Sequence, residues 1–121
     1  MPRVGRFELF AEDPVRAVCF YQTAFGWEIR RTGDQPYWLV TTGPKGRPGI
    51  NGGIAPRSEA RCGCVNTIEV PSLDEYLERV VNAGGRVVVP KMPVSGMGWL
   101  AYCRDTEGNT FGLMQPNRKA K

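Results

Sequence analysis

Residues 7–27 read FELFAEDPVRAVCFYQTAFGW and contain the pattern of one strand followed by one helix. The run 7–10 is short, aromatic and aliphatic, which is typical of a strand. Asp13-Pro14 is a helix start, because a carboxylate caps free N–H groups and proline fits the first helical position. Apolar residues recur at helical spacing over 15–25, and Gly26 is suited to end the helix. This stretch therefore predicts a strand, a helix and a glycine stop.

The remainder of the first half reads as strands. Residues 27–31 and 37–41 have strand composition, and residues 43–49 (GPKGRPG) form a turn-rich loop. Residues 50–56 then read as a glycine-rich strand. The first half thus has the order strand, helix and three strands.

The second half repeats that order. An offset of 59 residues places Asp13 on Ser72 and Gly26 on Gly85. Ser72 begins a capping-box pattern that ends at Glu75. The predicted elements are a strand over 65–70, a helix over 73–83, a strand over 86–89 and a hairpin of 98–103 with 110–115. We therefore predict an α+β fold of two tandem βαβββ modules, about 4–57 and 63–116, forming an open, cupped mixed sheet with helices on its convex side.

Length and composition limit the function classes. The 121 residues fit one domain. A basic tail at 117–121 follows the second module. No apolar run approaches the ~20 residues of a membrane helix, so no membrane association is expected. The net charge is +4, but the basic residues are dispersed, which argues against nucleic acid and leaves room for a small anionic ligand.

The chain has no histidine and four cysteines. The lack of histidine excludes Ser-His-Asp and Cys-His catalysis by this chain and any histidine-ligated metal. The spacing Cys62-Gly63-Cys64 is a weak metal signal, since structural zinc sites need four ligands, usually spaced C-x₂₋₄-C. No secretory signal is apparent, so reduced thiols and a cytoplasmic location are expected.

The repeat resembles the vicinal oxygen chelate superfamily, which contains glyoxalase I, bleomycin resistance proteins and extradiol dioxygenases. Residues 7–27 resemble its first module, and Pro48-Gly49-Ile50-Asn51-Gly52-Gly53 resembles its glycine-rich fourth strand. Gly84-Gly85 and the DTEGNTF run at 105–111 resemble the second helix end and the final hairpin. The resemblance covers about residues 4–116 and implies paired βαβββ modules in a homodimer.

The resemblance also implies where a metal would be held. The superfamily's four ligand positions fall at Arg6, near Gly53, at Val65 and at Gly112. Arginine is permanently cationic, and valine and glycine offer no donor side chain. We therefore predict no metal and no cofactor, and we do not expect a metal-dependent glyoxalase I or dioxygenase activity.

Strand alternation predicts which side chains line the cup. Phe7 and Leu9 should face the helix, so Arg6 and Glu8 should face the cup. The same argument selects Val65, Thr67, Glu69 and Met114 in the second module. Tyr37 or Trp38, Asn51, Trp99 and Tyr102 are further candidates for the walls.

These residues suggest a pocket for a small organic molecule. Arg6 could hold an anionic group, and Glu8 or Glu69 could act as a general base. The simpler interpretation is that Arg6 pairs with one of these carboxylates and fills the former metal position. Three functions follow: a metal-independent lyase or isomerase, a drug- or metabolite-sequestering protein without catalysis, and a structural or regulatory dimer without a ligand.

Overall fold

The computed structural model describes residues 1–31, 33–94 and 96–117. The predicted basic tail, apart from Asn117, lies outside these residues. One compact unit comprises Gly5–Val65, and the other comprises Met1–Val4 with the chain from Asn66 onward. No helix in the described ranges has both the length and the apolar character needed to cross a membrane.

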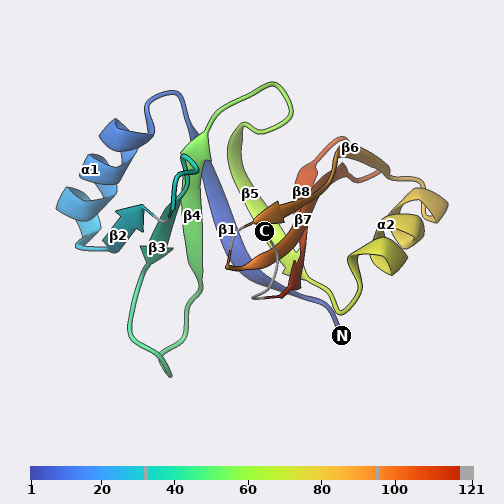
Figure 1. The fold of residues 1–121 in the computed structure, drawn as a ribbon, viewed down its shortest axis with the longest axis horizontal. Helices are drawn as coiled ribbons and strands as arrows, with labels where there is room; N and C mark the ends of the chain where they lie inside the picture. The colour runs from blue at the N-terminus through green and yellow to red at the C-terminus, as the bar shows by residue number, and fades with distance from the viewer. Residues whose placement is uncertain (32, 95, 118–121) are drawn as a thin grey trace. The chain divides into compact units, whose positions relative to one another are not determined.

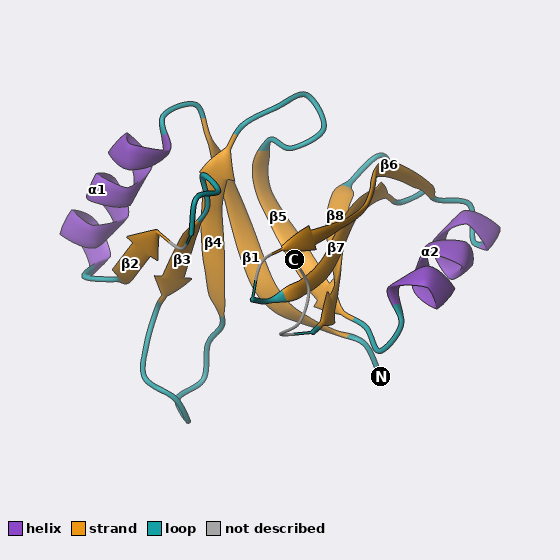
Figure 2. Cartoon of the chain, viewed as in Figure 1, coloured by secondary structure: helices purple, strands orange, loops and turns teal. Residues whose placement is uncertain are grey.

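The elements follow the predicted order twice, as Figures 1 and 2 show. The first series is β1 (Arg3–Ala11), α1 (Pro14–Phe25), β2 (Glu28–Arg31), β3 (Trp38–Thr41) and β4 (Asn51–Pro56). The second is β5 (Gly63–Glu69), α2 (Leu73–Asn82), β6 (Arg86–Val94), β7 (Gly98–Arg104) and β8 (Thr110–Pro116). The α+β fold class and the duplicated βαβββ unit are therefore confirmed.

Both helices begin at the predicted caps. The Asp13 carboxylate accepts a hydrogen bond from the Arg16 backbone N–H at 3.1 Å, and the Ser72 hydroxyl accepts one from the Glu75 backbone N–H at 3.3 Å. These bonds satisfy N–H groups that have no partner within the helix. Gly26 ends α1 with φ +71°, a conformation that favours glycine.

The two modules have matching mixed sheets. The strand order is β2-β3-β4-β1 in the first module and β5-β8-β7-β6 in the second. In each, the first strand pairs in parallel with the last, and the other pairings are antiparallel. The pair Glu8–Gly53 corresponds to the pair Thr67–Gly112, both members being 59 residues apart. The repeat that the sequence suggests is thus reproduced in the strand register.

Each module has its own core between helix and sheet. In the first module, the buried residues Val18, Val40 and Ile54 join α1 to β3 and β4, and Phe7 and Leu9 of β1 pack against them. In the second module, the core consists of Val70, Leu73, Ala101, Cys103 and Leu113, with Ile68 and Phe111 packed against it. The helix-facing sides predicted for β1, β5 and β8 are therefore confirmed.

Strand β6 is longer than predicted. The sequence indicated a strand over 86–89, whereas β6 continues to Val94 through Pro90 and Pro93. Proline cannot donate to a sheet hydrogen bond and is tolerated at edges and bulges. β6 is the end strand of its module, and its pairing with β7 shifts between Val87 and Met92. These irregularities allow the prolines to remain in the strand.

Candidate functional site

Three polar side chains of the first module form a hydrogen-bonded series on the side of β1 away from α1. Arg6 and Glu8 are two residues apart on β1, so both point to that side. An Nη2 of Arg6 donates to the Tyr37 hydroxyl at 3.0 Å. Tyr37 is also hydrogen-bonded to Glu8. The hydroxyl accepts from the guanidinium, so its own proton is the one available to the carboxylate.

Burial is uneven within this series. Glu8 is only 2% exposed, whereas Arg6 and Tyr37 are half-buried. Burial, together with the negative charge of Glu8, raises the pKa of Tyr37 to about 12, against an opposing effect of Arg6. Tyr37 is therefore neutral at physiological pH and retains the proton that it shares with Glu8. The buried Glu8 carboxylate thus has the Arg6 guanidinium nearby. A nearby opposite charge stabilises a charged group that is removed from water.

A glycine makes room for Tyr37. Gly53 lies opposite Glu8 in the register of β1 and β4. A Cβ built at Gly53 would collide with the hydroxyl and ring of Tyr37, so the tyrosine occupies the volume that a side chain would need. Tyr37 precedes β3 and shares its alternation with Leu39, whereas Trp38 and Val40 alternate toward the helix. The sequence left open whether Tyr37 or Trp38 joined the site, and the structure selects Tyr37.

The second module has a neutral counterpart. Thr67, fully buried, lies opposite Gly112 in the register of β5 and β8. A Cβ built at Gly112 would lie 3.0 Å from the Thr67 hydroxyl and 3.5 Å from the Tyr102 ring. Tyr102 is only 1% exposed. Both modules therefore have a glycine with a tyrosine beside it, but only the first places a carboxylate opposite that glycine.

The other predicted site residues vary in their surroundings. Val65 and Met114 are buried. Glu69 is exposed, and its backbone is paired with that of Met114 between β5 and β8. Asn51 is exposed, and its side-chain oxygen accepts a hydrogen bond from the Thr42 backbone N–H at 3.0 Å. Asn51 thus holds together the two ends of the loop between β3 and β4.

Two tryptophans do not share the side of the sheet that carries Arg6 or Tyr102. Trp38 packs against the core between α1 and its sheet, and Trp99 packs against the core beside α2. A cation lies over each ring, Arg31 at 5.2 Å from the Trp38 centroid and Lys91 at 5.0 Å from that of Trp99. Their placement on the helix-facing sides corrects the prediction that they line the cup.

The chemistry of the expected ligand positions does not fit a metal ion. Arg6 would repel a cation, and Tyr37 fills the volume beside Gly53. Val65 is an aliphatic side chain, and Gly112 is flanked by Thr67 and Tyr102. Within the described ranges there is also no group of three or more His, Cys, Asp or Glu side chains placed to hold a metal. The residues at these positions therefore do not form a metal site.

Comparison with known families decides the classification. A family model described as a glyoxalase-like domain matches residues 7–114. The chain belongs to this glyoxalase-like family. It is thereby a member of the vicinal oxygen chelate superfamily, as the sequence motifs indicated.

Solved structures of this glyoxalase-like fold carry several names. A methylmalonyl-CoA epimerase from Streptomyces coelicolor, in complex with 2-nitronate-propionyl-CoA, is 16% identical with a TM-score of 0.64, and the match covers 98% of this chain and 97% of that one. The Mycobacterium tuberculosis methylmalonyl-CoA epimerase is 17% identical with a TM-score of 0.59, over 94% of this chain and 86% of that one.

A structure named NAD-dependent benzaldehyde dehydrogenase, from Legionella pneumophila, is 13% identical with a TM-score of 0.67, over 93% of this chain and 98% of that one. No curated protein matches the sequence. At these identities the similarities show the fold alone.

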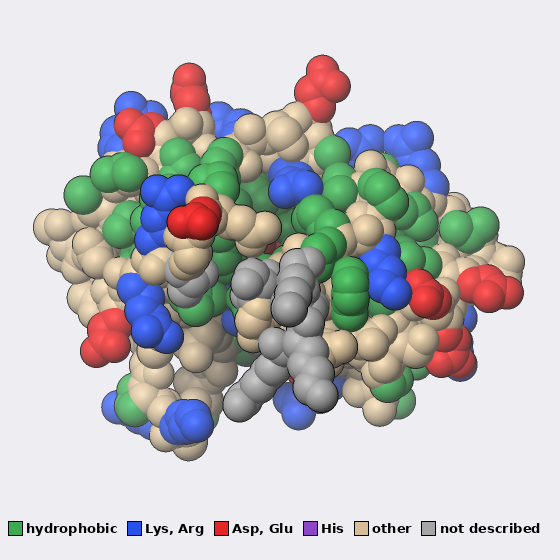
Figure 3. All heavy atoms as spheres, viewed as in Figure 1, with side chains coloured by type: hydrophobic (Ala, Val, Ile, Leu, Met, Phe, Trp, Pro, Cys, Tyr) green, Lys and Arg blue, Asp and Glu red, His purple; other side chains and the backbone are tan. Residues whose placement is uncertain are grey.

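The site of this glyoxalase-like protein offers a fixed cation, a neutral hydroxyl and a buried carboxylate in one series. On the face drawn in Figure 3, lysine and arginine side chains lie at separate places and do not gather into one patch. Recognition of an anionic ligand would therefore depend on a local cation such as Arg6. A carboxylate beside a cation can accept a proton from a ligand whose developing negative charge the cation stabilises.

Proposed function

We propose that this glyoxalase-like protein binds a small organic anion at Arg6 and acts on it as a lyase or isomerase that uses no metal. The observation that supports the proposal is the hydrogen-bonded series Arg6–Tyr37–Glu8. Arg6 is half-buried, so part of the residue is open to solvent, from which an anionic group would approach. An anion that replaces the Tyr37 hydroxyl on Arg6 also separates Tyr37 from Glu8.

In this proposal Glu8 is the general base. Its carboxylate takes a proton from the carbon next to a carbonyl group, and the electron pair of that C–H bond moves into an enolate. Arg6 stabilises the enolate oxygen, and Glu8 then returns the proton to the opposite face of that carbon, after the enolate turns, or to another carbon of a conjugated enolate, which completes an isomerisation. The similar folds named epimerases support this class of reaction, since epimerisation at such a carbon needs one proton removed and one returned.

Glu69 is the second candidate base, and it is exposed. Glu8, in contrast, is buried and is hydrogen-bonded to Tyr37, which also bonds to Arg6. We therefore assign the role of base to Glu8 and expect Glu69→Gln to retain activity.

Exchange of substrate protons for solvent deuterium tests the proposal. The protein in deuterium oxide is mixed with 2-oxo acids and acyl-CoA esters that carry a hydrogen next to the carbonyl, and exchange is followed by NMR. Glu8→Gln should abolish exchange and leave the protein folded by circular dichroism. Glu28→Gln, a matched change on β2, should leave the rate unaltered. Exchange retained in Glu8→Gln would remove Glu8 from the mechanism.

The alternative function is sequestration of a metabolite or drug without catalysis. The burial of Glu8 favours it, because a carboxylate with 2% exposure and a fixed partner is shielded from a ligand. Thermal stabilisation by a compound that remains chemically unchanged would support sequestration. We also propose a cytoplasmic homodimer, which light scattering after size exclusion tests by mass.

A further inference from the structure

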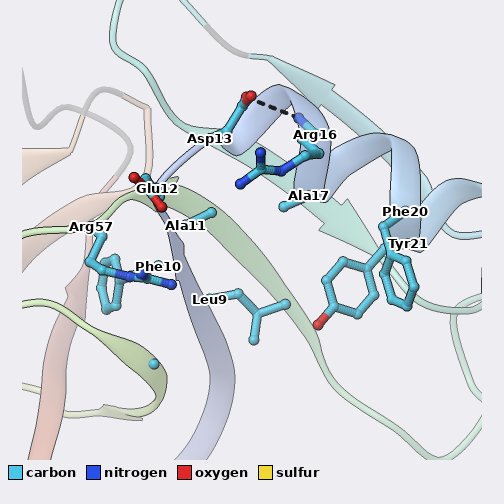
Figure 4. A pocket seen from close by; sticks show the side chains of 11 residues that line it. Leu9, Phe10, Ala11, Glu12, Asp13, Arg16, Ala17, Phe20, Tyr21 and Arg57 are labelled. Carbon is cyan, nitrogen blue, oxygen red and sulfur yellow. Dashed lines mark hydrogen bonds between the residues drawn. The ribbon is translucent and has the colours of Figure 1, made fainter.

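A cavity lies within Gly5–Val65, between β1 and α1. It has a volume of about 540 Å³ and is formed by the end of β1, the first part of α1, Arg57 after β4, and Gly63 (Figure 4). Pockets that hold small organic ligands measure about 300–1,000 Å³. Its lining residues include Leu9, Phe10 and Ala11 of β1, but none of Arg6, Glu8 or Tyr37. The cavity is therefore separate from the series that begins at Arg6.

The cavity has an apolar floor and an aromatic wall. Leu9, Ala11 and Ala17 contribute aliphatic surface from β1 and α1. Phe20 is 58% exposed and meets Tyr21 edge-on, with ring centroids 5.0 Å apart. Tyr21 is itself stacked on Trp27 at 5.0 Å and 3°. The stacking fixes the Tyr21 ring, so the wall is preformed for a flat apolar molecule.

Two arginines border the same cavity. Arg16 is carried by the first turn of α1, and Arg57 is attached to the end of β1 by its backbone N–H, which donates to the Ala11 carbonyl at 2.9 Å. Across residues 1–31, 33–94 and 96–117, neither guanidinium has a side-chain hydrogen bond or ion pair. Both sets of donors are thus available to a ligand.

The two acidic residues of the lining set the charge of that ligand. Asp13 accepts a hydrogen bond from the Arg16 backbone N–H, drawn as the dashed line in Figure 4, and is thereby committed to the start of α1. Glu12 is exposed, and together with Asp13 it balances the charge of the two guanidiniums, so the lining is neutral overall. Because Asp13 already accepts a backbone N–H, the guanidinium donors beside the apolar wall are left for a ligand with no more than one carboxylate on an apolar body.

We propose that this cavity, bounded by Arg16, Arg57 and Phe20, is a second binding site, and that it takes a flat aromatic monocarboxylate. The carboxylate lies between the guanidiniums, and the ring lies against Phe20 and the aliphatic floor. Such a site would let an aromatic acid influence the protein without occupying the surface near Arg6.

Titration with 2-naphthoate, followed calorimetrically with the full chain, tests this site. Saturable binding of one molecule per chain is expected. Arg16→Gln and Arg57→Gln should each weaken binding about fivefold or more, since each removes a charge-assisted contact. Phe20→Ala should also weaken it, and 2-naphthalenemethanol, which lacks the charge, should bind more weakly. Arg47→Gln, an exposed change in the loop between β3 and β4, is the matched control and should bind normally.

Three outcomes would overturn the proposal. The first is unaltered affinity in both Arg16→Gln and Arg57→Gln, each shown to be folded by urea denaturation. The second is loss of binding in Arg6→Gln alone, which would place 2-naphthoate at the other site. The third is a change of oligomeric mass in Phe20→Ala and Arg57→Gln with no effect on 2-naphthoate, which would assign the cavity to a second copy of the chain.

Discussion

The Tyr37 hydroxyl occupies the volume directly over Gly53 that a side chain at position 53 would need. From there it accepts from Arg6 and bonds to Glu8. The hydrogen-bonded series therefore requires glycine at position 53, although Gly53 itself makes none of its side-chain hydrogen bonds.

Replacement of Gly53 by alanine should therefore destabilise the protein. The new methyl group must displace Tyr37, and overpacking of this kind costs about 1–3 kcal/mol. Urea denaturation measures the free energy of unfolding. Gly112→Ala is the matched control, because a Cβ there meets Thr67 at 3.0 Å and should cost less. Tyr37→Ala/Gly53→Ala should be no less stable than Tyr37→Ala alone. Equal costs for the two glycines, or strict additivity in the double variant, would contradict this account.

Alkaline pH should weaken the fold through Tyr37. Its pKa is raised from 10.0 to about 12, chiefly by burial and next by Glu8. Between these values the folded chain retains a proton that the unfolded chain has lost, so the contribution is complete below pH 10 and disappears as pH rises through about 12. Tyr37→Phe lacks this contribution. The difference in unfolding free energy between the wild type and Tyr37→Phe should therefore shrink over this range, and a constant difference would count against it.

Acid should weaken the turn between β7 and β8. The Asp105 carboxylate accepts hydrogen bonds from the Asn109 backbone at 2.9 Å, the Asn109 side chain at 3.1 Å and the Glu107 backbone at 2.8 Å. These bonds, led by those from Asn109, hold the pKa of Asp105 below its usual value of 3.8. Its stabilisation is present above pH 3.8 and is lost as pH falls through the lowered pKa.

Melting temperatures of Asp105→Ala measure this effect. The variant should melt below the wild type at neutral pH, and the gap should narrow in acid. Asp34→Ala is the control and should melt at the same temperature as the wild type, because the exposed Asp34 carboxylate makes no hydrogen bond among the residues that the structure describes. A difference in melting temperature that is the same in acid as at neutral pH would show that Asp105 acts independently of its charge.

Thiol reactivity should divide the cysteines into two groups. Cys19, Cys62 and Cys64 are exposed, whereas Cys103 is buried in the core beneath α2, and burial raises its pKa to about 11. The thiolate is the reactive form, so Cys103 should be inert at neutral pH. A chromogenic disulfide reagent should therefore label three thiols of the native protein rapidly and the fourth only after unfolding. Rapid labelling of Cys103, detected by mass spectrometry, would contradict its burial.

The sequence predicts most of the fold because its signals are local. The caps at Asp13 and Ser72 place each helix start within one residue of the structure. Alternation correctly places Phe7 and Leu9 toward α1, which turns Arg6 and Glu8 to the other side. These features depend on period and on hydrogen bonds within a few residues, which the sequence displays directly.

The remainder depends on contacts that are distant in sequence. Tyr37 lies before its strand, so alternation alone could not place it over Gly53, which is 16 positions away. The residues next to Trp38 and Trp99 in the sequence do not show which side of the sheet each side chain faces. Packing against the cores beside α1 and α2 determines this. The extension of β6 to Val94 depends on shifts in pairing with β7 that tolerate proline.

The tyrosine over Gly53 also makes a metal site difficult to engineer at this place. A donor side chain introduced at position 53 would meet the Tyr37 ring, and a metal ion would still face the charge of Arg6. A single substitution is therefore insufficient, and a redesign of this chain as a metalloprotein would have to replace Tyr37 and Arg6 together with Gly53.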